Sequence, residues 1–262
     1  MFQPLHTGRL GLTAQQRGLD TIGNNIANLS TTGYKKVRLD FQDNLYTRMF
    51  NKTDMDPDMN LQRGTGVREY QTARIHLQGA LVPTGRSLDF ALEGHGYFVL
   101  QNPNPVDEEE LDQYFFTRDG AFYLSDEEGE NFLVDEFGRY VMDTEGERII
   151  IPDPENLFCD SMGNLTMMEN GEEIIIAQLG LADFTNRGGL ASVGENAFVQ
   201  TVNSGEMLEV TAAVHHAATE SSNVDLAEEM TRMIRTQRAY QIASRCVTTA
   251  DQMMQVANAI RS

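Results

Sequence analysis

The chain closes with a long stretch free of glycine and proline, and this stretch limits how the chain can fold. No glycine or proline follows Gly205, so nothing between Thr219 and Ser262 breaks a helix. We expect a helix over residues 223–260, about 57 Å long at 1.5 Å per residue. Ser222 followed by Asp225 has the spacing of an N-terminal capping arrangement. A helix of this length has to bury an apolar face against a partner.

Small and apolar residues recur along this helix in steps of four and three, which is the pattern of a heptad seam. Two such seams lie side by side, because one helix step turns about 100°. The first contains Ala239, Ala243, Cys246, Ala250, Met253, Ala257 and Ile260, and the second contains Leu226, Met230, Met233, Tyr240 and Val247. So wide a face indicates helices for subunit assembly, with the alanines setting a close helix–helix approach; an ordinary core helix is the alternative. On the seam, Cys246 is expected to be a small buried apolar residue.

A second heptad lies at the N-terminus and predicts a helix that ends near Leu29, because Ser30 to Gly33 are turn and cap residues. Its apolar positions, also predicted to serve assembly, are Leu5, Leu12, Leu19, Ile22, Ile26 and Leu29. A lone amphipathic helix of this length is marginal in water. We therefore expect the N- and C-terminal helices to pair as an α-helical coiled coil. Asn24, Asn25 and Asn28 either fix the register of the pair or belong to a fraying last turn.

The charge is concentrated in the middle of the chain. Of the net charge of −19, residues 101–175 carry −18, from 21 acidic residues and 3 arginines, whereas the first fifty residues carry +3. This asymmetry indicates two kinds of structure, and the net charge disfavours nucleic acid as a partner. No apolar run is long enough for a transmembrane segment, and the N-terminus lacks the apolar core of a cleaved signal peptide.

The middle of the chain is expected to be an all-β, antiparallel domain. Short apolar runs alternate there with acidic, glycine-containing turns, and residues 132–134, 139–142 and 148–152 are expected to be consecutive strands. Gly94 to Gly96 is expected to be a turn between two strands. The predicted fold class is thus α+β and discontinuous. Its parts are a helical coiled-coil domain of residues 1–33 with 220–262, an extended connecting segment of residues 34–71, and a β-rich domain of residues 72–219.

Several motifs resemble the rod and hook proteins of the bacterial flagellum. They include NNIANLSTTGYKK (24–36), RGTGV (63–67), FTRDGAFYLSDEEG (116–129) and NVDLAEEMTRMIRTQRAY (223–240). They follow the order of that family and cover most of the chain, and the length and RGTGV are most similar to its distal rod members. The N-terminal family motif contains Asn24, Asn25, Asn28, Thr32, Gly33 and Tyr34.

The resemblance implies a structural subunit of the basal-body rod. Such a subunit polymerises helically through its terminal helices, beside neighbouring rod and hook proteins, and forms the driveshaft between motor and hook. It implies an inner tube of helices, an outer β layer, and export by the flagellar export apparatus without a cleaved signal. A proximal rod or hook protein of the same family is the nearer alternative.

No residue pattern predicts a catalytic, cofactor-binding or metal site, so we expect no enzyme. The five histidines show no metal-binding spacing, and Asp54, Asp56 and Asp58 lack the glycine and glutamate of a calcium loop. A paired-carboxylate glycosidase site in the acidic domain is the enzymatic alternative, but the chain has no Trp for a sugar platform. A calcium- or glycan-binding β module on a coiled-coil stalk is the remaining alternative of another class.

Overall fold

The structure, a computed structural model, forms two compact units. It describes residues 3–48, 62–102, 114–127, 129–152, 154, 156–169, 172–210 and 212–261. Unit 1 comprises Met1–Ala27, Val37–Arg74 and Asp225–Ser262, and unit 2 comprises Asn28–Lys36 and Ile75–Val224. Two helices and a large antiparallel β region confirm the predicted α+β class.

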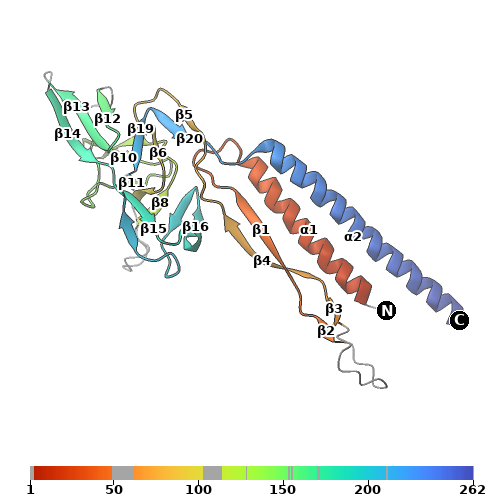
Figure 1. Cartoon of the computed structure of the whole chain (residues 1–262). Helices are drawn as coiled ribbons and strands as arrows, with labels where there is room; N and C mark the ends of the chain where they lie inside the picture. The colour runs from red at the N-terminus through yellow and green to blue at the C-terminus, as the bar shows by residue number, and fades with distance from the viewer. Residues whose placement is uncertain are drawn as a thin grey trace. The chain divides into compact units, whose positions relative to one another are not determined.

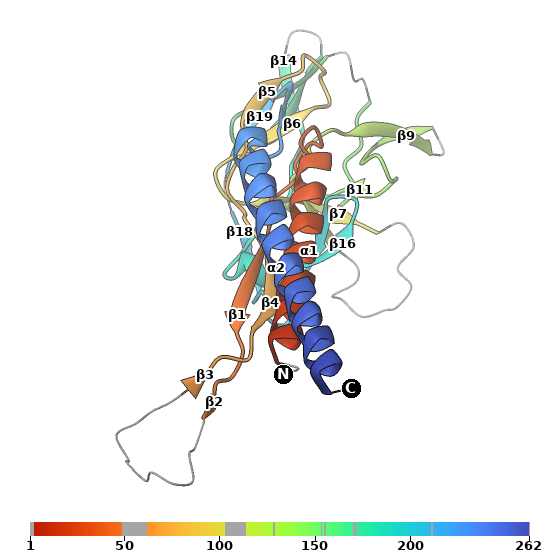
Figure 2. The ribbon, with the colours of Figure 1, turned by 90° about the vertical axis from the view of Figure 1, so that its right-hand side faces the viewer.

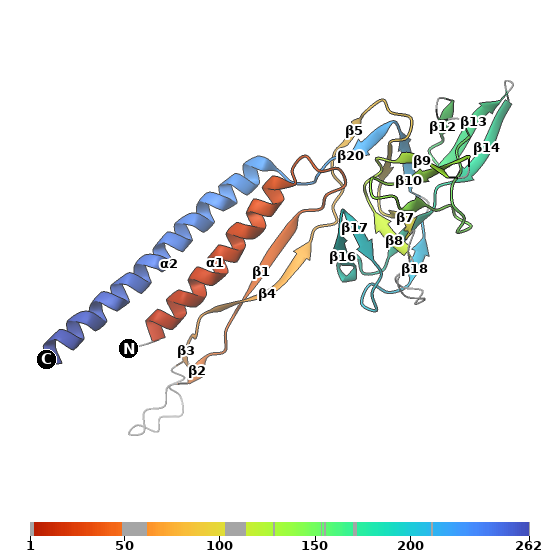
Figure 3. The ribbon, with the colours of Figure 1, turned by 180° about the vertical axis from the view of Figure 1, so that it is seen from behind.

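Unit 1 contains the terminal helices α1 (Gln3–Ala27) and α2 (Leu226–Arg261). They lie side by side and antiparallel in every view (Figure 1, Figure 2 and Figure 3). At 36 residues, α2 is about 54 Å long. Neither described helix is long and apolar enough to cross a membrane.

The capping residue of α2 differs from the prediction. Asp225, not Ser222, caps the helix, and its Oδ1 accepts hydrogen bonds from the backbone N–H of Ala227 at 2.8 Å and of Glu228 at 3.2 Å. The Ser222 hydroxyl instead accepts from the N–H of Val224 at 3.4 Å. The predicted start at residue 223 was therefore early, because a carboxylate directly before the first turn satisfies its free N–H groups.

A β ribbon accompanies the helices in unit 1. Strand β1 (Val37–Asp43) pairs antiparallel with β4 (Val67–Arg74), and β2 (Thr47–Arg48) pairs with β3 (Gln62–Arg63). These strands occupy the described part of residues 34–71, where an extended connecting segment was expected. Arg17 of α1 forms an ion pair with Glu69 of β4. The aspartates compared with a calcium loop, residues 54–58, lie outside the described residues.

Unit 2 is built from antiparallel strands. The order in its largest described sheet is β16 (Ala191–Gly194), β17 (Ala197–Val199), β8 (Tyr114–Thr117), β7 (Tyr97–Gln101), β11 (Tyr140–Val141), β10 (Glu130–Val134) and β9 (Tyr123–Glu127). Strand β15 (Leu181–Phe184) pairs with β7 and with β18 (Met207–Glu209). Smaller sheets contain β12 (Leu157–Cys159), β13 (Asn164–Glu169) and β14 (Glu172–Gln178); β6 (Phe90–Glu93) with β19 (Ala213–His216); and β5 (Leu81–Pro83) with β20 (Ala218–Glu220). A short 3-10 helix spans Arg187–Gly189.

Strand β7 separates two apolar clusters and explains where the core lies. Phe98 and Leu100 contribute to one cluster, and Tyr97 and Val99 contribute to the other. Because successive side chains of a strand point to opposite faces, β7 is buried on both. The uninterrupted apolar run YFVL is typical of such a strand.

The predicted strands and turns were partly correct. Residues 132–134 and 139–142 contribute to β10 and β11, and Gly94 to Gly96 join β6 to β7 as expected. Residues 148–152 do not form a strand. They make single bridges, Phe132 with Ile150 and Met142 with Arg148. Ile149 and Ile151 are buried there, so the alternation of apolar residues reflects burial in the core and not a continuous ladder of backbone hydrogen bonds.

Candidate functional site

Small residues allow the two terminal helices to approach closely. A Cβ atom added to Gly8 of α1 would lie 2.7 Å from Cγ2 of Val247 in α2. One turn further, the corresponding position at Gly11 is 3.9 Å from Cβ of Ala243. A side chain at Gly8 would therefore push the helices apart, whereas a Cβ at Gly11 would make an ordinary van der Waals contact.

The outward side of α2 carries exposed apolar side chains along its whole length. They are Leu226, Met230, Ile234, Tyr240, Ile242, Met253, Val256 and Ile260. Exposure ranges from 37% for Tyr240 to 81% for Ile260. An apolar face of this extent on a helix marks a surface that another molecule covers.

The predicted assembly residues fall into two groups. Partly or fully buried are Leu5, Leu12, Leu19, Ile22, Ile26, Leu29, Met233, Ala239, Ala243, Val247, Ala250 and Ala257. Exposed are Leu226, Met230, Tyr240, Cys246, Met253 and Ile260. Cys246 is thus not the buried residue that was predicted. The reason is that the helix pair buries the side of α2 carrying Ala243 and Val247, and Cys246 lies beside this side rather than on it. Sequence analysis missed the exposed Ile234, Ile242 and Val256.

One amide fixes α1 against the other elements of unit 1. The Asn25 side chain donates to the Val37 carbonyl at 2.9 Å and accepts from the Val37 N–H at 3.0 Å. It also donates to Oε2 of Glu229 in α2 at 3.2 Å. Asn25 and Glu229 are both buried. Of the two interpretations of the asparagines, register fixing therefore holds for Asn25.

The glycine of the family motif has a conformation and a contact that require it. Gly33 has a φ of 65°, and an added Cβ would lie 2.6 Å from the backbone N of Asp119. Beside it, the Thr32 hydroxyl donates to Oδ2 of Asp119 at 2.7 Å, and Tyr34 is buried. These contacts hold the first linker of unit 2 against the turn after β8. The other motif residues, Asn24 and Asn28, lie at the end of α1 and just after it.

A buried charge cluster in unit 2 was not predicted. Lys35 Nζ lies 2.6 Å from Oε1 of Glu220, and Arg118 Nη1 lies 3.2 Å from Oε2 of the same carboxylate. The three side chains are 1%, 0% and 4% exposed for Lys35, Glu220 and Arg118. Burial lowers the pKa of Lys35, and the charge and hydrogen bond of Glu220 oppose that shift. Nothing in the sequence spacing links these residues, which are 185 positions apart at the extremes.

Asn223 joins the segments through which the chain leaves unit 2. Its Oδ1 accepts from the Lys36 N–H at 2.7 Å, and its Nδ2 donates to the carbonyls of Ile75 at 2.7 Å and Leu77 at 3.0 Å. Residues 28, 36, 75 and 224 are the four ends of unit 2 that continue into unit 1. Asn223 therefore ties three of these connections, those at residues 36, 75 and 224, together inside unit 2.

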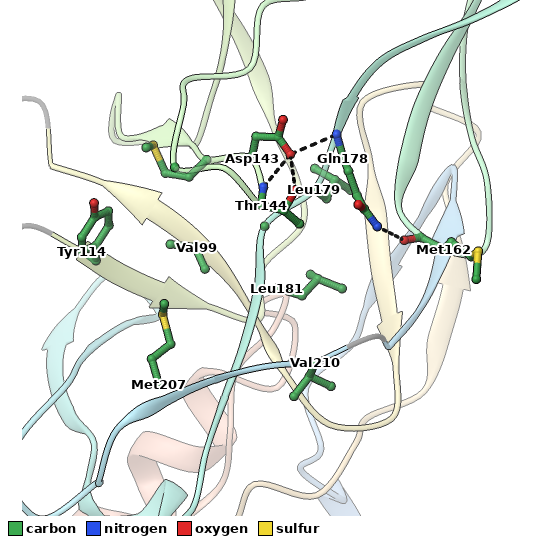
Figure 4. A pocket seen from close by; sticks show the side chains of 13 residues that line it. Val99, Tyr114, Asp143, Thr144, Met162, Gln178, Leu179, Leu181, Met207 and Val210 are labelled. Atoms are coloured by element: carbon green, nitrogen blue, oxygen red, sulfur yellow. Dashed lines mark hydrogen bonds between the residues drawn. The ribbon is translucent and has the colours of Figure 1, made fainter.

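Unit 2 also has a groove of about 490 Å³, lined mainly by apolar side chains (Figure 4). Its carboxylate, Asp143, is used structurally. Its Oδ1 accepts from the N–H of Thr144 at 2.5 Å, the Thr144 hydroxyl at 3.0 Å and the N–H of Gln178 at 3.1 Å. These three hydrogen bonds hold the turn at Asp143 and Thr144.

Other reactive side chains are also committed to structure. Burial raises the pKa of the Cys159 thiol to about 12, which is the opposite of nucleophile activation. His215 Nε2 lies 2.7 Å from the Glu93 carboxylate, and His216 Nε2 lies 2.9 Å from the Ser87 carbonyl. Among the described residues, no three His, Cys, Asp or Glu side chains are grouped to hold a metal ion. Surfaces rather than pockets are the candidate functional features.

Comparison with known proteins agrees along the chain. The model for flagella basal body rod proteins matches residues 5–35. The flagellar hook protein FlgE/F/G D1 domain model matches residues 91–181, and the model for the C-terminal part of flagellar basal body rod FlgEFG proteins matches residues 216–260. The matched ends contain most of α1 and most of α2, and the middle match lies in unit 2.

Several full-length relatives are described as flagellar basal-body rod protein FlgG, and one from Bacillus subtilis, 29% identical over 100% of both chains, as flagellar hook-basal body complex protein FlhP. The relative from Buchnera aphidicola subsp. Acyrthosiphon pisum is 36% identical over 97% of this chain and 98% of its own length. Relatives from Caulobacter vibrioides and Borreliella burgdorferi are 33% and 31% identical, over 100% of this chain and 100% and 99% of their own.

These matches define the class as the structural rod and hook proteins of the bacterial flagellum. The chain belongs to the family of flagellar basal-body rod proteins FlgG, as a FlgG-like distal rod subunit of the basal body. The family resemblance predicted from the motifs is thereby confirmed.

Proposed function

We propose that this rod subunit polymerises helically through the helix pair of unit 1, with coiled-coil packing of α1 against α2. The observation that carries the proposal is the exposed apolar face of α2. Burial of each such side chain by a neighbour would contribute about 1.5–3 kcal/mol. Several of them together offset the cost of ordering and associating the subunits.

The charge distribution also supports assembly through unit 1 and not through unit 2. Unit 1 carries a net charge of +2 and unit 2 carries −21, which together give the −19 of the chain. Unit 1 can therefore pack against copies of itself without strong repulsion, whereas copies of unit 2 repel one another. We accordingly propose an inner layer of unit 1 helices and an outer layer of unit 2. Neighbouring rod and hook proteins are the proposed partners at the ends, and the flagellar export apparatus is the proposed route out of the cell. The acidic balance disfavours nucleic acid.

Self-association of the purified chain tests the proposal. We expect sedimentation velocity to show concentration-dependent association of the full chain, and a monomer for a fragment of residues 28–224, which lacks both terminal helices. This fragment keeps Lys35, Glu220 and Arg118, which form the buried charge cluster of unit 2. Equal association of fragment and full chain would refute assembly through the helices.

Salt should strengthen association of the full chain. The Debye length falls from about 30 Å at 0.01 M to about 10 Å at 0.1 M ionic strength, which screens the repulsion between copies of unit 2. The apolar contacts of unit 1 are not weakened by the same change. If salt instead dissolved the assemblies, ion pairs rather than apolar burial would hold them.

A further inference from the structure

Unit 1 contains a groove lined largely by small residues and a ridge of large apolar side chains, which are complementary in size and in polarity. The groove, of about 660 Å³, is formed by the first turns of α1, the middle of α2 and the segment after β3. Its lining is largely small: Gly8, Gly11, Gly64, Ala239 and Ala243, with Ile242 and Cys246 along one side. Arg63 is the one charged residue in the lining.

The ridge lies on the last turns of α2. Met253, Val256 and Ile260 are 65%, 60% and 81% exposed, and their spacing of three and four places them on one face. The sequence from Met253 to Ile260 contains no charged residue. Large apolar side chains that project from one helix pack into the depressions left by small residues on another.

The end of α2 projects past the described part of α1. Because Gly8 lies against Val247 and the helices are antiparallel, Gln3 lies opposite about residue 252. The ridge residues therefore have no described part of α1 beside them. Up to about residue 252, the described part of α1 covers one side of α2, whereas beyond it the ridge residues lie on the unpaired end of α2.

The ridge cannot fill the groove of its own chain. Ile242 in the groove and Val256 in the ridge are fourteen residues apart on one continuous helix, which is about 21 Å along its axis. A straight helix cannot fold back over that distance. An occupant of matching size, apolarity and neutrality is the ridge of a second copy.

We propose that the Met253–Val256–Ile260 ridge of one subunit seats in the Gly8–Gly11–Ala239–Ala243 groove of the next. The inference rests on the proposed polymerisation and names its contact. Because ridge and groove are different patches, the contact is heterologous and need not close on itself, so it extends into a filament. The subunit at one end of the filament then has a free ridge, and the subunit at the other end has a free groove.

Disulfide trapping tests the contact, because the exposed Cys246 lines the groove. In a Cys159→Ser background, Val256→Cys, or Met253→Cys as a second variant, places a thiol on the ridge. Full-length variants are expressed in a strain lacking the native gene, and isolated basal bodies are oxidised with copper phenanthroline. We expect a ladder of cross-linked species extending beyond the dimer, and its loss beyond the dimer when Cys246→Ser is added.

Asn258→Cys is the matched control, since Asn258 is exposed two residues after Val256 and points to the opposite side of α2. It should give no ladder. Basal bodies that contain the ridge variants but yield only dimers, or no cross-link, would overturn the ridge-in-groove contact and leave the proposed function standing. Absence of the unaltered chain from basal bodies would instead count against the proposed function.

Discussion

Replacing Glu220 with glutamine is expected to destabilise the chain by about 3–5 kcal/mol, the cost of breaking a buried ion pair from one side. Glutamine keeps the size of the side chain but leaves Lys35 and Arg118 buried without a counter-charge. The loss is measured by urea unfolding followed by circular dichroism. Glu206→Gln, at an exposed position, is the control and should leave the midpoint unchanged. A midpoint for Glu220→Gln equal to that of the control would contradict the cluster's role.

The order of the single variants gives a second check on the same cluster. Lys35→Met removes one cation but leaves Glu220 with Arg118 and with the Gly79 N–H at 2.6 Å. Its cost should therefore be smaller than that of Glu220→Gln, which leaves two cations unpaired. The reverse order would show that Lys35, rather than the carboxylate, holds the cluster together.

Raising the pH should restore part of the stability of Glu220→Gln. Burial lowers the pKa of Lys35, and the variant lacks the carboxylate that opposes this shift. Between the folded-state pKa and the ordinary Lys value, the unfolded chain binds more protons than the folded chain, so stability rises with pH. The difference in urea midpoint from the unaltered chain should narrow as the pH is raised towards the ordinary Lys pKa of about 10.4. A constant difference would mean that Lys35 stays fully protonated in the variant.

Replacing Gly8 with leucine is expected to abolish rod formation and motility. A Cβ at this position already lies 2.7 Å from Cγ2 of Val247, and the β-branched Val247 side chain has little freedom to turn away from it. Overpacking of this kind costs about 1–3 kcal/mol and displaces the helices. Motility is measured in soft agar, and folding is measured by circular dichroism. Loss of swimming with a near-native β signal would separate failed helix pairing from general unfolding.

Gly23→Ala is the matched control on the same helix, because no atom lies within 4 Å of a Cβ built at Gly23. It should swim normally and gain about 0.5–1 kcal/mol from helix propensity. A rescue variant sharpens the test: Val247→Ala should partly restore motility to Gly8→Ala by removing the clashing methyl groups. Normal swimming of Gly8→Leu would show that close approach of α1 and α2 is not needed.

The terminal helices could be predicted from the sequence because their signals are local. The absence of helix breakers and the recurrence of apolar residues every three and four positions predicted the bounds of both helices to within a few residues. The apolar run YFVL and the glycine turns likewise identified β strands. Family motifs identified the protein class, since several short blocks occur in one order.

What escaped prediction depends on contacts between distant residues. Lys35, Arg118 and Glu220 look like ordinary surface charges until the fold brings them together. Periodicity also could not decide which side of α2 faces α1, because α2 is apolar on more than one side. Cys246 was therefore placed in the buried seam, and the exposed Ile234, Ile242 and Val256 were overlooked. The strand expected over residues 148–152 failed for a related reason: alternation of buried side chains does not by itself specify a ladder of backbone hydrogen bonds.

The most direct test of assembly through unit 1 is electron microscopy of basal bodies from a strain that lacks the native gene and carries a supplied copy. A full chain should restore the distal rod. A chain ending at residue 224 keeps unit 2 intact and lacks α2, and it should leave basal bodies without that part of the rod. Rods of normal length built from the shortened chain would contradict the account.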